Sequence, residues 1–330
     1  MATYKGINGF AVQSVASDPS PTDEGQVWYN NASYAFKLAS VTTAGTWASG
    51  GNLSAGTTQM GSAGIQTAAL MFGGNSGSIT AVTEEYDGSA WTAGGSLPTA
   101  RAYLKGCGTQ TAALAIGGAT PSPGATGTTQ AYDGTSWTSG GTMSTARNLL
   151  GAAGIQTAAL AFGGTPPNAG LTATEEYDGT SWTSGGSMGT GRYMLGGAGT
   201  QTAALGFGGY KVPATISAAT EEYDGTSWTA GGSLITGRYG LAGAGTQTAG
   251  LGFGGTTGYP QSSDLTEQYN GSSWTATGTM ITGRRYLGGC GTQASALAFG
   301  GVPNNTTTRV TNTEEFNGPG SPVTQTITTS

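Results

Sequence analysis

The 330-residue sequence contains no histidine. It therefore lacks the commonest metal ligand of proteins and the commonest general base of enzymes, and most hydrolase and metalloenzyme mechanisms are hard to write without that side chain. The sequence predicts a protein that is not an enzyme, with no metal site and no cofactor.

Charged residues are also scarce, at 8% of the chain with a formal net charge of -6. Without a basic stripe, the chain has nothing to follow a phosphate backbone, so nucleic acid is an unlikely partner. No run of about 18 apolar residues could span a bilayer, and the start MATYKGINGF lacks the pattern of a secretory signal. We expect a soluble chain made in the cytoplasm, without membrane insertion. The lysines number only four: Lys5, Lys37, Lys105 and Lys211.

Cysteine occurs only twice, as Cys107 and Cys290. The two lie at equivalent places in the second and sixth of six internal repeats, which are not neighbours in a ring of six. We therefore expect both to be reduced and to serve as small core residues.

Glycine is abundant instead, with 62 residues, and its distribution is periodic. The string GIQTAALMFGG at 64–74 returns five times in similar form, at intervals of 44 to 46 residues. Such self-similarity indicates a repeat architecture. The six copies end in glycine doublets to which we assign a structural role: Gly73 and Gly74, Gly117 and Gly118, Gly163 and Gly164, Gly208 and Gly209, Gly254 and Gly255, and Gly300 and Gly301.

A second landmark, YDGSAW at 86–91, recurs with the same period and ends as FNGPGS at 316–321. An Asp-Gly or Asn-Gly pair between strand formers predicts a two-residue hairpin turn, with the Asp as a turn residue rather than a ligand. The Tyr and the Trp then lie on one side of the sheet as an apolar wedge. The structural tryptophans of this wedge are Trp47, Trp91, Trp137, Trp182, Trp228 and Trp274.

Each repeat thus contains four short strands, which is typical of an all-β fold. The Gly-Gly doublet, followed by Tyr and then Trp, resembles the kelch motif over roughly residues 45 to 321. The resemblance implies a six-bladed β-propeller, whose first strands line a central channel and whose fourth strands lie at the rim. The propeller is expected over residues 41–322.

The last repeat has no Trp strand, whereas one is left over at the start, where GTWASGGNL at 45–53 matches TSWTSGGTM in the middle of the chain. We expect Trp47 to complete the sixth blade. This N-terminal strand would close the ring and leave no open edge.

The candidate site is the face that carries the loops between second and third strands, because these loops vary while the strands are nearly copied. Five repeats place an arginine before the first strand, with Thr57 at the same place in the first repeat. Guanidinium groups and phenols around a channel mouth could hold acidic or neutral sugars. The candidate ligand-binding residues are Arg101, Arg147, Arg192, Arg238, Arg284, Tyr103, Tyr193, Tyr239, Tyr286, Tyr210, Lys211 and Tyr259.

The alternative is structural: each arginine pairs with a glutamate of the recurring TEEY segment and braces neighbouring blades. The glutamates concerned are Glu84 and Glu85, Glu175 and Glu176, Glu221 and Glu222, and Glu314 and Glu315.

Two enzyme families of similar architecture fit poorly. Galactose oxidase resembles this repeat pattern, but its copper site needs histidines. Sialidase propellers carry a recurring Asp box with a residue between Asp and Gly, whereas here the two are adjacent.

Residues 1–40 lie outside the repeats. The stretch at 18–38 contains a strand, an Asn-Asn turn and a second strand, which predicts a hairpin, and its EGQVWYN segment resembles segments of phage tail-fibre and other virion proteins. The resemblance implies a bacteriophage virion protein, present in multiple copies, whose N-terminal extension attaches to other virion proteins. Residues 323–330 are expected to be a C-terminal tail.

Three functions follow as hypotheses. In the first, the propeller is displayed on a phage particle and its loop face binds a host surface glycan or receptor, or another virion protein. In the second, it is an architectural spacer or decoration without a ligand. In the third, it is an intracellular kelch scaffold for a protein partner.

Overall fold

The computed structural model divides into two compact units, one of residues 47–316 and one formed by residues 1–46 together with 317–330. All regular elements of the described residues are β-strands, and none of these residues forms a helix long and apolar enough to cross a membrane. The described residues are 4–5, 11–18, 26–41, 44–122, 124–165, 170–211, 213, 215–320 and 322–327.

The larger unit contains six antiparallel sheets of four strands among its described residues. Sheet one is β6 Gly61–Ile65, β7 Ala68–Phe72, β8 Thr83–Tyr86 and β9 Trp91–Ala93, and sheet two is β10 Lys105–Gly108, β11 Ala113–Ile116, β12 Thr129–Tyr132 and β13 Trp137–Ser139. Sheet three is β14 Gly151–Ile155, β15 Ala158–Phe162, β16 Thr174–Tyr177 and β17 Trp182–Ser184, and sheet four is β19 Gly196–Gly199, β20 Ala204–Phe207, β23 Thr220–Tyr223 and β24 Trp228–Gly231. Sheet five is β25 Ala242–Gly245, β26 Gly250–Phe253, β27 Thr266–Tyr269 and β28 Trp274–Ala276, and sheet six is β30 Gly288–Gly291, β31 Ser295–Phe299, β33 Thr313–Asn317 and β5 Thr46–Ser49.

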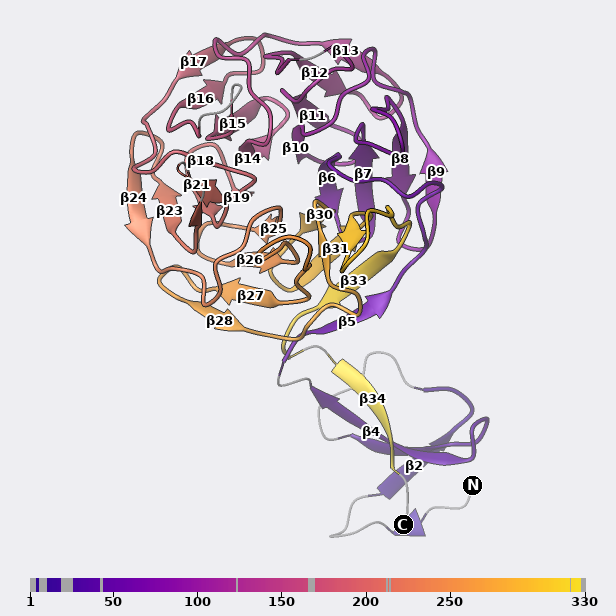
Figure 1. Ribbon diagram of the computed structural model, residues 1–330. Coiled ribbons are helices and arrows are strands. Elements are labelled where there is room, and N and C mark those ends of the chain that lie inside the picture. The colour runs from indigo at the N-terminus through magenta and orange to yellow at the C-terminus, as the bar shows by residue number, and fades with distance from the viewer. Residues whose placement is uncertain are drawn as a thin grey trace. The chain divides into compact units, whose positions relative to one another are not determined.

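The sheets are arranged about a common axis as in a β-propeller (Figure 1). The first strand of each sheet lies beside the first strand of the next, and β30 of sheet six lies beside β6 of sheet one. The outermost strand of sheet six is β5, which comes from the start of the chain and pairs with β33. The strand that carries Trp47 thus lies where the sequence predicts it.

The second strands are apolar on both faces because both faces are covered by neighbouring sheets. In β7, β15, β20 and β26 the last four residues are buried. Small residues such as Ala and Gly fit these crowded inner strands. The core is therefore a series of apolar clusters, each lying between two neighbouring sheets.

The Asp-Gly segments form longer turns than the sequence predicts. Tyr86 is paired directly with Trp91, so the turn has four residues rather than two, and only Gly88 has a positive φ in its Asp-Gly pair. The Asp87 carboxylate accepts backbone N–H bonds from Ser89 and Ala90, both at 2.8 Å. This capping stabilises a four-residue loop, and it confirms that the Asp is a turn residue.

The predicted aromatic wedge is present, and each tryptophan also contacts the preceding sheet. Trp274 packs on Tyr269 of its own sheet at 5.0 Å between ring centroids and on Phe207 of sheet four at 4.8 Å. Its indole N–H donates to the Thr220 hydroxyl of sheet four at 2.9 Å. The other five tryptophans make the equivalent bond: Trp91 to Thr313, Trp137 to Thr83, Trp182 to Thr129, Trp228 to Thr174 and Trp47 to Thr266.

The glycine doublets join neighbouring sheets at the opposite end of the strands. Gly255 donates its N–H to the Arg284 carbonyl of the next sheet at 2.8 Å. Both glycines of the doublet have positive φ, and a Cβ on Gly254 would lie 2.7 Å from that same carbonyl oxygen. A larger residue would collide, so the doublet is structural. The equivalent bond from Gly301 to the Thr57 carbonyl, also 2.8 Å, joins sheet six to sheet one.

A glutamine that the sequence analysis did not single out provides a further link. Gln247, in the turn after the first strand of sheet five, donates to the carbonyls of Ala204 and Tyr223 in sheet four at 3.1 and 2.7 Å. The same pair of bonds is made by Gln66, Gln110, Gln156, Gln201 and Gln293. The recurring Gln of the GIQT and GTQT segments is therefore a clamp between sheets.

A tyrosine–glutamate bond also crosses between sheets. The Tyr269 hydroxyl donates to Glu222 of sheet four at 2.5 Å and accepts the Gly232 N–H. The second Glu of TEEY thus contacts the next sheet, whereas the first Glu serves its own sheet. The other such bonds are Tyr86 to Glu315, Tyr132 to Glu85 and Tyr223 to Glu176.

These four tyrosines should titrate late. Burial, and then the hydrogen bond to a carboxylate, raises the pKa of Tyr86, Tyr132, Tyr223 and Tyr269 from 10 to about 12. A raised pKa in the folded state means that the stability due to these groups is complete below pH 10 and is lost as the pH rises from 10 to 12. A titration of tyrosinate absorbance in the folded protein should show a transition near pH 12 from these tyrosines. The amplitude of that transition should be smaller in a variant with Phe at all four positions. A single transition at the ordinary pKa would contradict the prediction.

The smaller unit is a five-stranded sheet of order β1-β2-β3-β4-β34. Its hairpin of β3 and β4 confirms the prediction for residues 18–38. Residues 323–327 of the expected C-terminal tail instead belong to β34, which pairs with β4, while residues 328–330 lie outside the described residues. The boundaries predicted at residues 41 and 322 thus shift to 47 and 316. Sequence patterning missed this because the two strands are nearly 300 residues apart. The strands are β1 Tyr4–Lys5, β2 Ala11–Val15, β3 Val27–Asn30, β4 Ala35–Val41 and β34 Pro322–Ile327.

Two residues of the EGQVWYN segment, Trp28 and Asn30, have a structural role in this hairpin. Trp28 is fully buried, and its indole N–H donates to Asp18 at 2.9 Å. The Asn30 side chain also donates to Asp18, at 2.6 Å, while its oxygen accepts the N–H groups of Ala32 and Ser33. These bonds, from Asn30 first and Trp28 second, lower the pKa of Asp18.

Candidate functional site: the loop face and the axial channel

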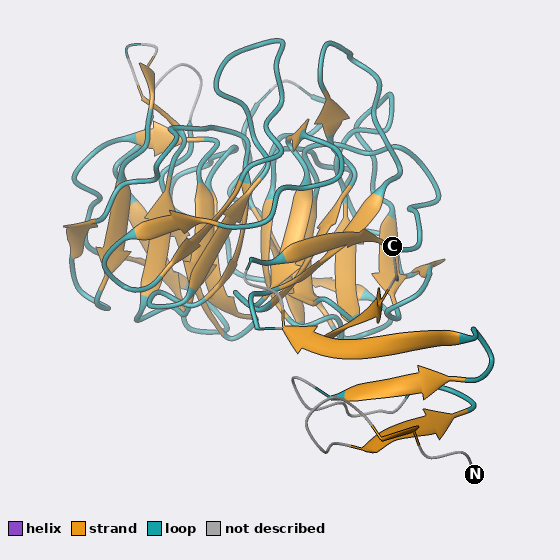
Figure 2. Ribbon diagram, turned by 90° about the horizontal axis from the view of Figure 1, so that it is seen from below, coloured by secondary structure: helices purple, strands orange, loops and turns teal. Residues whose placement is uncertain are grey.

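The loops between second and third strands all leave the larger unit at one end, here called the loop face (Figure 2). Antiparallel topology places the starts of the first strands, and hence the arginines, at this same end, with the Asp-Gly turns at the other. Short extra strands occur at this end. The loops between second and third strands contain β21 Tyr210–Lys211, β22 Thr215–Ile216 and β32 Val302–Pro303, and the segments that lead into first strands contain β18 Arg192–Tyr193 and β29 Arg284–Arg285.

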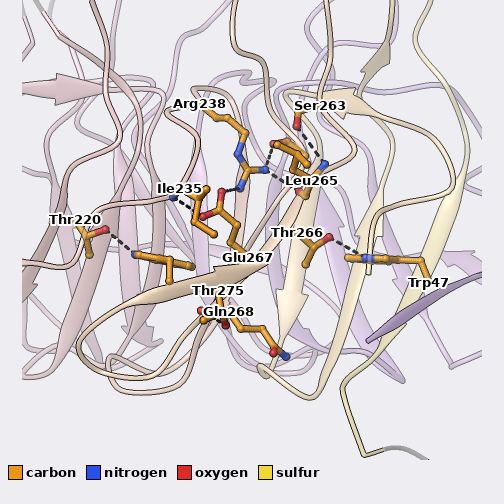
Figure 3. Close-up of polar contacts among 12 residues, drawn as sticks. Trp47, Thr220, Ile235, Arg238, Ser263, Leu265, Thr266, Glu267, Gln268 and Thr275 are labelled. Carbon is orange, nitrogen blue, oxygen red and sulfur yellow. Dashed lines mark hydrogen bonds and ion pairs between the residues drawn. The ribbon is translucent and has the colours of Figure 1, made fainter. Parts of the chain in front are cut away.

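The five arginines do not face solvent. Arg238 has no exposed surface, and its guanidinium group donates to the carbonyls of Gly254 and Leu265 at 2.8 and 2.7 Å (Figure 3). It also forms an ion pair of 2.9 Å with Glu267, whose other oxygen accepts the Ile235 N–H at 2.7 Å. The other three ion pairs are Arg147 with Glu175, Arg192 with Glu221, and Arg284 with Glu314.

Arg101 is held in the same geometry as the other four arginines, but its partner carries no charge. It is equally buried and donates to the neutral oxygen of Gln130 at 2.6 Å. Burial without a carboxylate lowers the pKa of Arg101 to about 10. The interior thus accepts either Glu or Gln as the partner of the guanidinium group.

The interpretation of the arginines as a ligand-binding ring is therefore wrong. Four of the five guanidinium groups are paired with buried glutamates, as the alternative interpretation holds, and the fifth, Arg101, is hydrogen-bonded to Gln130. That alternative needs one correction, because each arginine precedes the first strand of the very sheet whose third strand carries its glutamate: Arg238 precedes β25 and Glu267 lies on β27. The arginine ties the loop that enters its sheet to the third strand, and neighbouring sheets are joined by the Trp, Gln and Gly-Gly bonds.

The candidate tyrosines, in contrast, are partly exposed and several of them cluster. Tyr193 contacts Tyr210 at 5.5 Å between ring centroids, Tyr210 contacts Tyr239 at 5.2 Å, and Tyr239 contacts Tyr286 at 6.4 Å. Tyr210 is brought there by β21, which pairs with β18 so that Tyr210 faces Tyr193 and Lys211 faces Arg192. We call Tyr193, Tyr210, Tyr239 and Tyr286 the tyrosine cluster.

Burial raises the pKa of Tyr193, Tyr239 and Tyr286, and neighbouring tyrosines add to the shift. All three phenols are therefore neutral at physiological pH. The cluster presents edges and faces of uncharged aromatic rings, which suit stacking against a sugar ring or an apolar side chain.

Tyr259 lies apart from the tyrosine cluster and is 71% exposed. The Arg285 guanidinium lies 5.2 Å from the centre of its ring. Arg285 also donates to the carbonyl of Pro260 at 3.0 Å and the hydroxyl of Ser262 at 2.8 Å, which fixes this loop. Arg285 is not part of the repeat pattern, because no other repeat has an arginine at that position.

A closed collar of backbone hydrogen bonds surrounds the axis below the loops. Each member donates its N–H to the carbonyl of the member from the preceding sheet, at 2.7 to 2.9 Å, and each has a positive φ near 60°. Only one member is a glycine. The candidate tyrosines that follow an arginine therefore belong to two sets. Tyr103 and Tyr286 are themselves collar residues, whereas Tyr193 and Tyr239 each come one residue before a collar residue. The members are Gln59, Tyr103, Leu149, Met194, Gly240 and Tyr286.

Two small cavities of about 40 Å³ each lie along the axis. The first is lined by the collar and by Leu104, Leu241 and Leu287. The second lies among the first strands and is lined mainly by glycine backbone and Ser62. Lys105 and Leu287 line both cavities, so the two are adjacent.

The remaining chemistry of the described residues is sparse. No three His, Cys, Asp or Glu side chains among them are grouped so that they could hold a metal ion. Cys107 and Cys290 are free and buried, as predicted, and burial raises the pKa of both thiols to about 12. Such thiols are not nucleophiles at neutral pH.

Comparisons with known proteins show the fold of the chain but no family to which it belongs. No protein-family profile matches the sequence, and no curated protein matches it. Among solved structures, the chain is similar to YjhT, a kelch-like β-propeller, with a TM-score of 0.67 and 14% sequence identity. The similarity covers 79% of this chain and 95% of YjhT. At this identity the match shows a β-propeller fold alone.

Proposed function

We propose that the chain is a non-enzymatic binding protein of a bacteriophage particle, and that its loop face binds a host surface glycan or receptor, or another virion protein. The larger unit would be a six-bladed, kelch-like propeller closed by the N-terminal strand β5. The observation that carries the binding proposal is the tyrosine cluster on the face with the variable loops. A β-propeller in general favours an interaction role.

The cluster supports binding because its rings are not consumed by the core. The wedge tyrosines are buried, and the wedge tryptophans, of which Trp91, Trp182 and Trp228 are only partly buried, each donate a hydrogen bond to the preceding sheet. The cluster rings lie in the loops beyond the sheets and keep part of their surface open to solvent. Tyrosine provides a large, rigid contact surface with few rotatable bonds, so that little side-chain entropy is lost on binding. Lys211, beside Tyr210, adds a cation for an acidic group.

The assignment to a virion rests on the sequence. The EGQVWYN segment resembles those of tail-fibre and other virion proteins, and the chain combines near-copied repeats with very few lysines. The smaller unit, which contains this segment, would attach the propeller to other virion proteins, and many copies would be present on a particle.

Glycan arrays of bacterial surface polysaccharides test the site directly. The double variant Tyr193→Ala/Tyr239→Ala should reduce binding about tenfold or more, because it removes two stacking rings worth about 1 kcal/mol each. The matched control is Ile155→Ala, which truncates a side chain 54% exposed at the opposite end of the strands. Equal binding by the double variant and the control would contradict the proposed site.

The architectural alternative is favoured by one observation: all five repeated arginines are internal, so the repeats conserve packing rather than a surface. It predicts that particles lacking the protein adsorb to the host normally and that the array shows no binding at all.

A further inference from the structure

Lys105 is a lysine at a position where the other five repeats have a glycine or an alanine. It is the first residue of β10, and the equivalent residues of the other five first strands are Gly61, Gly151, Gly196, Ala242 and Gly288. A Cβ at Gly61 would lie 2.2 Å from the ring of Phe72 in the paired second strand. The same collision would occur with Phe162, Phe207 and Phe299 at the other three glycines.

Sheet two avoids this collision by a second change. Where these sheets have Phe, it has Ile116, and Ile116 is paired with Lys105. The smaller side chain leaves room for a long side chain, whereas sheet five, in which Ala242 is paired with Phe253, has a single Cβ at this position. Two departures from the repeat, Lys for Gly and Ile for Phe, therefore act together to place one lysine side chain at the axis.

The channel gives this lysine no counter-charge. Lys105 has no hydrogen bond or ion pair among the residues that the structure describes, and no carboxylate lines either axial cavity. Burial lowers the pKa of Lys105 to about 8, so the amine is still largely protonated at neutral pH. An unpaired cation in a narrow, partly desolvated channel is costly unless an anion accompanies it.

The two cavities differ in character and are of similar size. The second cavity, among the first strands, is here called the inner cavity and is bordered by the polar backbone of Gly106, Gly197, Gly243 and Gly289. The first cavity, at the collar, is here called the outer cavity and is bordered mainly by apolar side chains, among them Leu149, Met194 and Leu241. A water needs about 10–15 Å³ in such a measure, so 40 Å³ accommodates about three non-hydrogen atoms in each cavity.

We propose that the axial channel binds a short-chain carboxylate, with the carboxylate held by the Lys105 ammonium group and the hydrocarbon end against the apolar side chains that line the outer cavity. A carboxylate has three non-hydrogen atoms and a charge-assisted hydrogen bond to an ammonium group is among the stronger polar contacts. A chain of three further carbons fills the outer cavity, which makes butyrate the natural probe. This site is separate from the tyrosine cluster and does not depend on the loop-face proposal.

Calorimetric titration of the full chain with butyrate, n-butanol and sodium chloride tests the proposal. Butyrate should bind with one site per chain, whereas butanol and chloride should bind at least about tenfold more weakly, because each lacks one half of the match. Glucuronate carries the same carboxylate on a sugar ring that is too large for the channel. Preferential binding of glucuronate, or equal binding of chloride, would overturn the assignment to a short-chain carboxylate.

Variants keep the test independent of folding. Lys105→Gly restores the residue of four other repeats and should fold, and Lys105→Met keeps much of the chain length without the charge. Both should lose about tenfold or more in butyrate affinity, while Lys37→Met, on β4 of the smaller unit, should bind butyrate as the unaltered protein does. In addition, butyrate should raise the pKa of Lys105, followed by NMR of its side-chain nitrogen. Unchanged affinity in both Lys105 variants, with no shift of that pKa, would refute the site.

Discussion

Trp47→Ala should lower the free energy of unfolding by about 3–5 kcal/mol, the usual cost of truncating a buried tryptophan. Trp47 is 9% exposed, packs on Phe316 at 5.1 Å and on Phe253 at 5.2 Å, and donates its indole N–H to Thr266. The substitution removes all these contacts at the point where the N-terminal strand meets the last sheet. Urea denaturation measures the loss.

Trp274→Ala is the matched control, because Trp274 of sheet five has the equivalent partners: Tyr269 in its own sheet, and Phe207 and Thr220 in sheet four. Its strand β28 stays attached to β27 through a hairpin turn, whereas no turn connects β5 to β33. Both variants should lose similar stability, but only Trp47→Ala should make residues 44–53 sensitive to limited proteolysis in native conditions. Resistance of this segment in both variants would show that β5 does not depend on Trp47.

Glu267→Ala should lower the free energy of unfolding by a similar amount, about 3–5 kcal/mol, because it leaves the Arg238 charge buried without its carboxylate. The guanidinium group is fully buried, and its two carbonyl acceptors cannot replace the lost negative charge. The Ile235 N–H loses its acceptor as well. Chemical denaturation of the purified chain gives the comparison with the unaltered protein.

The chain contains its own control for this prediction. Since Arg101 is paired with the neutral Gln130, Glu267→Gln should cost much less, on the order of 1 kcal/mol, because an acceptor is retained. The double variant Arg238→Met/Glu267→Leu should likewise lose less than Glu267→Ala, since no charge is left unpaired. If Gln at position 267 costs as much as Ala, a neutral acceptor does not replace the carboxylate of Glu267, and the prediction drawn from Arg101 and Gln130 is wrong.

The sequence predicted the repeat, the four-strand unit and the place of Trp47, because each depends on a local pattern that recurs. Period, turn signals and strand formers act over a few residues, and six copies make them unambiguous. The match between residues 45–53 and the other Trp strands was likewise visible as a copy left over at one end and missing at the other.

The site was predicted less well. Five arginines at one face suggested a ligand, and only burial showed that their charges are used inside each sheet. The signal was present, however, since four of the five accompany a Glu about 30 residues later and Arg101 accompanies Gln130. The pairing of β34 with β4, the collar and the meeting of Tyr193 with Tyr210 depend on long-range placement, which no local pattern encodes.

The same limit applies to Lys105. In the sequence it is one lysine among four, and its significance appears only when Ile116 is seen beside it and the axis is seen to lack a carboxylate. A comparison of the repeats, position by position, would have shown that both residues depart from the pattern in one repeat. It would not have shown that they touch.

The central claim is that the N-terminal strand completes the sixth sheet and so closes the ring. Nuclear Overhauser contacts of the Trp47 indole test it most directly, in a sample with labelled tryptophan and phenylalanine. The account predicts cross-peaks from Trp47 to the rings of both Phe316 and Phe253, residues 269 and 206 positions away along the chain. An indole whose cross-peaks lead only to other residues would contradict the closure.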